Sequence, residues 1–87
     1  MEGYSTIKEV RQVFSKCLDI IADKDPRYGS MWQKENMDEL LGNISRKFKG
    51  LEHQWKNDGE VDMEFPLDLI NYAAFFYMRL LKEQKDE

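Results

Sequence analysis

Apolar residues recur at helical spacing over three stretches of the chain. The first stretch alternates steps of three and four, the periodicity of one helix face. Its members are Ile7, Val10, Phe14, Cys17 and Ile21. The second stretch carries Met37, Leu40, Leu41, Ile44, Phe48, Leu51 and Trp55. With the apolar run near the C-terminus, this pattern predicts helices over residues 5–24, 36–56 and 63–84.

Turn-forming residues separate these helices. In "DKDPRYGS", Pro26 disfavours helical backbone at Asp25, so we expect "RYGSMW", residues 27 to 32, to form a loop. Asn36 and Glu39 have the spacing of a capping pair and predict the start of the second helix. "NDGE", residues 57 to 60, then ends it.

The last stretch predicts more burial than one small protomer provides. Pro66 fits the first turn of a helix, and "LDLINYAAFFYMRLL" after it is apolar almost all the way round. Such a helix needs neighbours on several sides, and two partner helices are too few. The 87 residues are also enough for only one small domain of marginal stability. We predict an all-α domain over residues 1–87, a bundle of three main helices completed by oligomerisation into a dimer or tetramer.

Composition and charge restrict the functional class. The net charge of -4 argues against general nucleic-acid binding, because such proteins present excess Lys and Arg to phosphates. One Cys and one His provide neither an intramolecular disulfide nor a Cys/His zinc site, and we expect Cys17 to act as a buried apolar group. There is no run of ~18 apolar residues or signal peptide, so we expect no membrane span and a cytoplasmic location.

Three oxygen-bearing side chains share one face of the last helix. Glu64, Asp68 and Asn71 are four and three residues apart, which places them on consecutive turns. Carboxylate and amide oxygens are ligands that hard cations prefer, so this face is a candidate magnesium site. Asp38 and Glu39, in the first turn of the second helix, would complete it if the two helices lay side by side.

A structural alternative explains the same residues. Continued along the helix, the face reaches Arg79 and Lys82, so it could be a solvated seam with acids at its start and bases at its end, as the helix dipole favours. Phe75 in the middle of the face argues against a seam. Acids in a first turn, such as Asp38 and Glu39, are likewise expected for dipole reasons alone. The sequence leaves both interpretations open.

Cations and aromatic residues supply candidate contacts to a nucleotide. Arg46 and Lys47 lie about two turns beyond Glu39 and could neutralise phosphate, although a solvated basic face has the same pattern. Tyr28 and Trp32 could stack on a base or ribose, although aromatic residues also cover the ends of small cores.

Three segments in order carry a family resemblance. "YGSMW", a helix containing "ISRKFKGL", and an acid four residues before "DLINYA" resemble the MazG-like all-α nucleoside triphosphate pyrophosphohydrolases, in particular the small nucleotide-modification-associated branch. The resemblance covers roughly residues 20–78. It implies a helical oligomer that binds magnesium and cleaves a nucleoside triphosphate to a monophosphate and pyrophosphate.

The resemblance also assigns roles to residues. It implies that Asp38, Glu39, Glu64 and Asp68 bind the metal, with Glu39 and Asp68 catalytic. Arg46, Lys47, Asn71, Tyr28 and Trp32 are then the expected nucleotide contacts. The first acidic motif departs from the family, because "DELLGN" has Gly42 and Asn43 where a third glutamate is expected. A non-catalytic oligomeric helical module that binds a nucleotide or a protein partner is therefore the alternative function.

Overall fold

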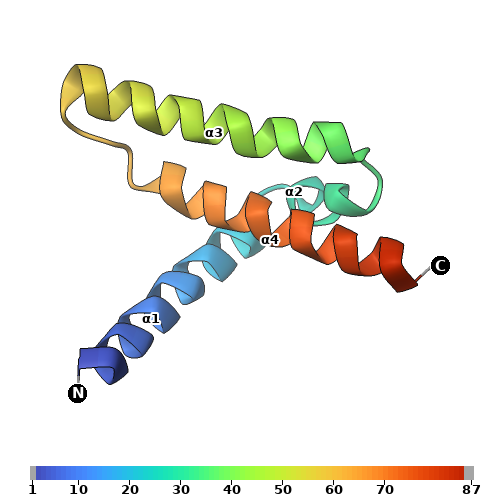
Figure 1. Ribbon diagram of the computed structural model, residues 1–87, viewed down its shortest axis with the longest axis horizontal. Coiled ribbons are helices and arrows are strands. Elements are labelled where there is room, and N and C mark those ends of the chain that lie inside the picture. The colour runs from blue at the N-terminus through green and yellow to red at the C-terminus, as the bar shows by residue number, and fades with distance from the viewer. Residues whose placement is uncertain (1, 86–87) are drawn as a thin grey trace.

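Every secondary structure element in the part that the structure describes is a helix. The computed structural model in Figure 1 describes residues 2–85, with the side chains of residue 3 and residues 5–84. Its elements in order are α1 (Glu2–Asp23), α2 (Pro26–Ser30), the 3-10 helix η1 (Met31–Gln33), α3 (Met37–Asp58) and α4 (Glu64–Lys85). The predicted all-α class is confirmed over these residues. No helix among them is both long and apolar enough to cross a membrane.

Helices α3 and α4 run antiparallel, side by side, and α1 crosses α4 (Figure 1). The first half of α1 projects away from the other helices. Close approach of α3 to α4 depends on Gly50, where an added Cβ would lie 3.2 Å from Cε2 of Phe65. Gly50 is therefore a point of close packing between the two helices.

The ends of α3 follow the chemistry that the sequence predicts. Asn36 Oδ1 accepts a hydrogen bond from the backbone N–H of Glu39 at 2.8 Å, and Asn36 Nδ2 donates to Glu39 Oε1 at 3.1 Å. At the other end, Gly59 has a φ of 72°, a left-handed conformation that costs glycine little, and its N–H donates to Trp55 O. Both caps satisfy backbone groups that a helix end leaves unpaired.

The start of α4 is also capped by a side chain. Asp62 Oδ1 accepts from the backbone N–H of Glu64 at 2.9 Å. Pro66 then falls in the first turn, where the missing N–H breaks no helical hydrogen bond. Helix α4 therefore begins at Glu64, one residue after the predicted start at residue 63.

The segment expected to be a loop contains two short helices. Residues 26–30 form α2 because Asp25 Oδ1 accepts from the N–H of Arg27 at 2.8 Å and Pro26 occupies the first helical position. Pro26 disfavours helix only at the residue before it, so it starts a new helix as readily as it ends the previous one. The prediction of a loop was wrong for this reason.

The core of the described chain is small and contains polar groups. Its fully buried apolar side chains are Cys17, Leu40 and Phe75. Asp68 and Asn71 are buried beside them, at 1% and 3% exposure. The buried state expected for Cys17 is confirmed. Burial of two polar side chains of α4 rules out the solvated seam at these positions, although Glu64 and Lys82 are exposed.

Candidate functional site

The centre of the site is the Asp68 carboxylate, which is surrounded by donors from α2, from α3 and from the residue that follows α1. Asp68 Oδ2 forms an ion pair with Lys47 Nζ of α3 at 3.1 Å. Asp68 Oδ1 accepts from the Tyr28 hydroxyl of α2 at 3.1 Å and lies 3.5 Å from Lys24 Nζ, just beyond α1. Each carboxylate oxygen therefore has a partner, as a buried charge requires.

The Lys24 ammonium also reaches a second carboxylate. It lies 3.2 Å from Glu64 Oε1 and 3.5 Å from Asp68 Oδ1, so a single cation bridges two acids one turn apart on α4. The Lys24 side chain is 35% exposed and that of Glu64 is 49% exposed, which leaves this pair accessible from solvent. The position between the two acids thus already attracts a positive charge.

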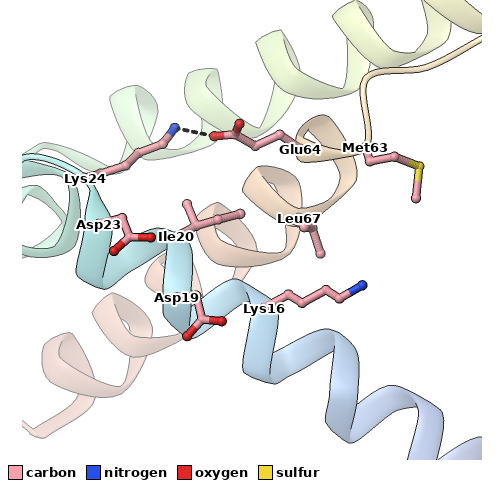
Figure 2. Close-up of a pocket in the computed structure, with 8 residues that line it drawn as sticks. All are labelled: Lys16, Asp19, Ile20, Asp23, Lys24, Met63, Glu64 and Leu67. Atoms are coloured by element: carbon pink, nitrogen blue, oxygen red, sulfur yellow. Dashed lines mark ion pairs between the residues drawn. The ribbon is translucent and has the colours of Figure 1, made fainter.

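A cavity of about 450 Å³ borders this ion pair, between the second half of α1 and the start of α4. Figure 2 shows Lys24 reaching toward Glu64 across it, with Ile20 and Leu67 nearby. The same cavity is lined by Lys16, Asp19 and Asp23 of α1. Charged groups of both signs therefore surround a space large enough for a phosphorylated ligand.

Asn71 joins the site to α1 and α2. Its Nδ2 donates to the backbone carbonyl of Cys17 at 3.1 Å and to the Tyr28 hydroxyl at 3.3 Å. Tyr28 is thereby held between Asn71 and Asp68, and the Lys24 ammonium lies 4.8 Å from its ring centroid. Asn71 is thus a positioning group rather than a solvent-facing ligand.

The surroundings change the proton affinities of three groups. Burial raises the pKa of the Tyr28 hydroxyl, the hydrogen bond from Asn71 opposes this effect, and the nearby charge of Asp68 adds to it. Burial works against the charged form of Lys24, but its hydrogen bond to Glu64 and the charges of Asp68 and Glu64 outweigh this effect and raise its pKa. Burial, with a contribution from Asp68, raises the pKa of the Cys17 thiol. Lys24 therefore stays charged, while Tyr28 and Cys17 stay neutral near pH 7.

The four predicted metal ligands do not gather at one point. Among the residues that the structure describes, no group of three or more His, Cys, Asp and Glu side chains could hold a metal ion. Asp38 and Glu39 are exposed, and Glu39 is engaged in the cap of α3. The residue of α3 that reaches Asp68 is Lys47, eight residues or about 12 Å further along the helix than Glu39. The expectation that Asp38 and Glu39 lie opposite Glu64 and Asp68 is therefore corrected. Within one chain, the α3 residue opposite Asp68 is Lys47.

The remaining predicted contacts divide between the site and the surface. Lys47 and Tyr28 are at the site, and Trp32 lies half-buried in η1. Arg46 is exposed and donates to Asn43 Oδ1 instead of meeting the acids of α4. The sequence did not indicate Lys24 as a site residue. The only local feature that marks it is its position as a cation at the end of an amphipathic helix, directly before "DP".

Comparison with known proteins adds no relative. A scan of family models, a search of curated proteins and a search of solved structures each return no match for this chain.

Proposed function

We propose that this protein binds a magnesium–nucleotide complex at Asp68 and hydrolyses a nucleoside triphosphate to a monophosphate and pyrophosphate. The observation that supports the proposal is the Lys24 ammonium bridging Glu64 and Asp68. A position between two carboxylates that attracts one cation has the charge to attract another. The family resemblance of "YGSMW", "ISRKFKGL" and "DLINYA" supplies the reaction.

Two carboxylates are enough for this role. Magnesium is commonly held by one or two carboxylates, with substrate phosphates and water completing its octahedron. Glu64 and Asp68 fit that description, and the proposal leaves out Asp38 and Glu39 because they lie too far along α3. Bound there, magnesium would neutralise phosphate charge and lower the pKa of an attacking water.

The lysines of the site supply the phosphate contacts. Without a ligand, Glu64 and Asp68 are balanced by Lys24 and Lys47. When a divalent cation takes the position between the acids, the two ammonium groups become free to bind phosphate oxygens. The cavity beside Glu64 and Lys24 gives the phosphate chain room. Metal and phosphate are then expected to bind together rather than separately.

The test is pyrophosphate release from a panel of canonical and modified triphosphates in the presence of magnesium. Glu64→Gln is the main variant because this residue is exposed, so its loss should leave the fold intact while turnover falls at least tenfold. Glu52→Gln removes a similarly exposed acid that pairs with Lys56 away from the site, and it should keep full activity. Absence of turnover with every triphosphate, together with unchanged magnesium binding in Glu64→Gln, would refute the proposal.

A second candidate function is a non-catalytic module that associates with a second copy of itself. The N-terminal part of the apolar stripe of α1 is uncovered, with Ile7, Val10 and Phe14 at 53%, 42% and 52% exposure, and Leu18 beside the stripe is 65% exposed. The stripe's alternating steps of three and four are the spacing of a coiled-coil seam, and a seam on a projecting helix suits pairing with an identical helix. This surface also suits the predicted dimer or tetramer, with or without catalysis.

Self-association is tested by sedimentation across a range of protein concentrations. Phe14→Lys places a charge in the seam and should shift the assembly toward monomer. Gln12→Lys adds the same charge outside the stripe and should leave the assembly unchanged. If the parent sediments as a monomer at every concentration, α1 is not a self-association surface.

A further inference from the structure

A second, smaller cavity lies between α3, α4 and the segment of α2 and η1. Its volume is about 120 Å³. Four aromatic and two polar residues dominate its lining: Tyr28, Trp32, Tyr72, Phe75, Glu35 and Asn43. The rings of Tyr28, Tyr72 and Phe75 meet edge to face, with centroids 5.6 to 6.2 Å apart. This volume is below the ~300 Å³ of drug-sized ligand sites, so the cavity suits one planar ring rather than a whole nucleotide.

The polar groups of the cavity have a fixed arrangement. Asn43 Nδ2 donates to Glu35 Oε2 at 3.1 Å, and Asn43 Oδ1 accepts from Arg46. The Arg46 contact fixes the orientation of the amide, so that its NH2 group is directed to the Glu35 side. A ligand ring therefore meets a carboxylate acceptor beside an amide donor.

This pair of groups distinguishes the bases by their exocyclic atoms. Cytosine carries an amino group that a carboxylate accepts from, next to ring and carbonyl acceptors that an amide N–H can reach. Uracil and thymine place a carbonyl oxygen where cytosine has the amino group. That oxygen and the Glu35 carboxylate are both hydrogen-bond acceptors, so they would repel each other. A purine has two fused rings, which the small cavity disfavours.

The cavity adjoins the charged site through both helices. On α3, Asn43 lies one turn before Lys47, and on α4, Tyr72 lies one turn after Asp68, an axial step of about 6 Å in each case. Tyr28 belongs to both places, because its ring lines the cavity while its hydroxyl donates to Asp68. A base in the cavity would thus have its sugar and phosphates next to the lysines and carboxylates.

We propose that this cavity binds the cytosine base of the nucleotide, with Glu35 accepting from the exocyclic amino group and Asn43 donating to the neighbouring acceptor. The inference rests on the proposed function for the placement of the phosphates, and adds to it a substrate class, the cytosine nucleotides. Glu35 and Asn43 are then the residues that determine specificity.

The experiment compares the affinities of cytidine and uridine monophosphates, measured by NMR titration so that no turnover is needed. The parent should bind the cytidine nucleotide about tenfold to a hundredfold more tightly, the range expected for one well-placed hydrogen bond to a charged group. Glu35→Gln exchanges an acceptor for a donor and should remove or reverse that preference. Glu52→Gln should retain it. Asn43→Leu, a second variant at the cavity, should weaken binding of the cytidine nucleotide.

The outcomes separate this inference from the proposed hydrolysis. Selective binding of the cytidine nucleotide without pyrophosphate release from its triphosphate supports the base site and refutes the hydrolase. Hydrolysis of all triphosphates at similar kcat/KM refutes the base site and supports the hydrolase. Equal affinity for the two monophosphates, no binding of either, or an unchanged preference in Glu35→Gln also overturns the base site.

Discussion

The ion pair between Asp68 and Lys47 should contribute far more to stability than an ion pair on the surface of the same helix. The two charges lie 3.1 Å apart, and the side chains are 2% and 27% exposed. Water therefore screens the carboxylate very little and the ammonium only in part. We expect neutralisation of either partner to destabilise the fold.

The size of the effect follows from the geometry. At 3.1 Å and an effective dielectric constant of about 20, the attraction is about 5 kcal/mol. Desolvation of both groups and repulsion from Lys24, which shares Asp68, reduce the net value. We expect a coupling of about 2 kcal/mol, against ~0.2–1 kcal/mol for exposed pairs. A domain of this size has only ~4–13 kcal/mol of total stability, so this is a substantial share.

A double-mutant cycle measures that coupling directly. The variants are Asp68→Asn, Lys47→Met and their combination, with free energies of unfolding from urea titrations followed by circular dichroism at one protein concentration. Asn keeps the shape of Asp and can still accept from Tyr28, so the cycle removes charge without opening a cavity. The control cycle uses Glu52→Gln and Lys56→Met, whose side chains are 45% and 68% exposed and 3.6 Å apart.

The coupling energy of the buried pair should exceed that of the exposed pair. A coupling for Asp68 and Lys47 no larger than the one for Glu52 and Lys56 would mean that burial of the carboxylate does not strengthen its attraction to an ammonium partner. In that case Asp68, one of the two carboxylates of the proposed metal site, would attract cations no more strongly than an exposed acid does.

Two further predictions concern the helix packing and the pH dependence. Gly42→Ala should stabilise the fold by about 1 kcal/mol, because the added Cβ would lie at an ordinary 3.5 Å from Arg46 Nη1. Gly50→Ala should stabilise it less or destabilise it, because the added Cβ would lie only 3.2 Å from Phe65. Urea titrations of the two variants compare their free energies of unfolding. The free energy of unfolding should fall as the pH rises above about 10. The pKa values of Lys24 and Tyr28 are raised in the folded state, so the folded protein keeps both protons at a pH where the unfolded chain, with ordinary pKa values of 10.5 and 10.0, releases them. Lys24→Met should flatten this decline, and a decline as steep as that of the parent would contradict the assignment.

Much of the fold follows from local pattern. Apolar positions at helical spacing mark α1 and α3, and a nearly continuous apolar run marks α4. The Asn36 cap was predictable because capping uses side chains only three residues apart. Burial of Asp68 and Asn71 was not decided by the sequence, because the same face also fits a solvated seam. Phe75 was the one local indication of a buried face, and it is indeed buried. The buried interpretation required the positions of α1 and α2, which periodicity does not give.

The main error in the candidate site was one of register between antiparallel helices. Gly50 contacts Phe65, Lys47 pairs with Asp68, and Asn43 and Tyr72 line one cavity. Each step of three or four backward along α3 is thus matched by an equal step forward along α4.

Continuing this register places Glu39 near residue 76 of α4, two turns beyond Asp68. The acids of the first motif and those of α4 are therefore separated along the hairpin axis even though their helices are neighbours. Asp19 and Asp23 of α1 line the cavity beside Glu64, whereas Asp38 and Glu39 of α3 do not. Any acid that supplemented Glu64 and Asp68 in the proposed magnesium site would therefore come from α1 rather than from the start of α3.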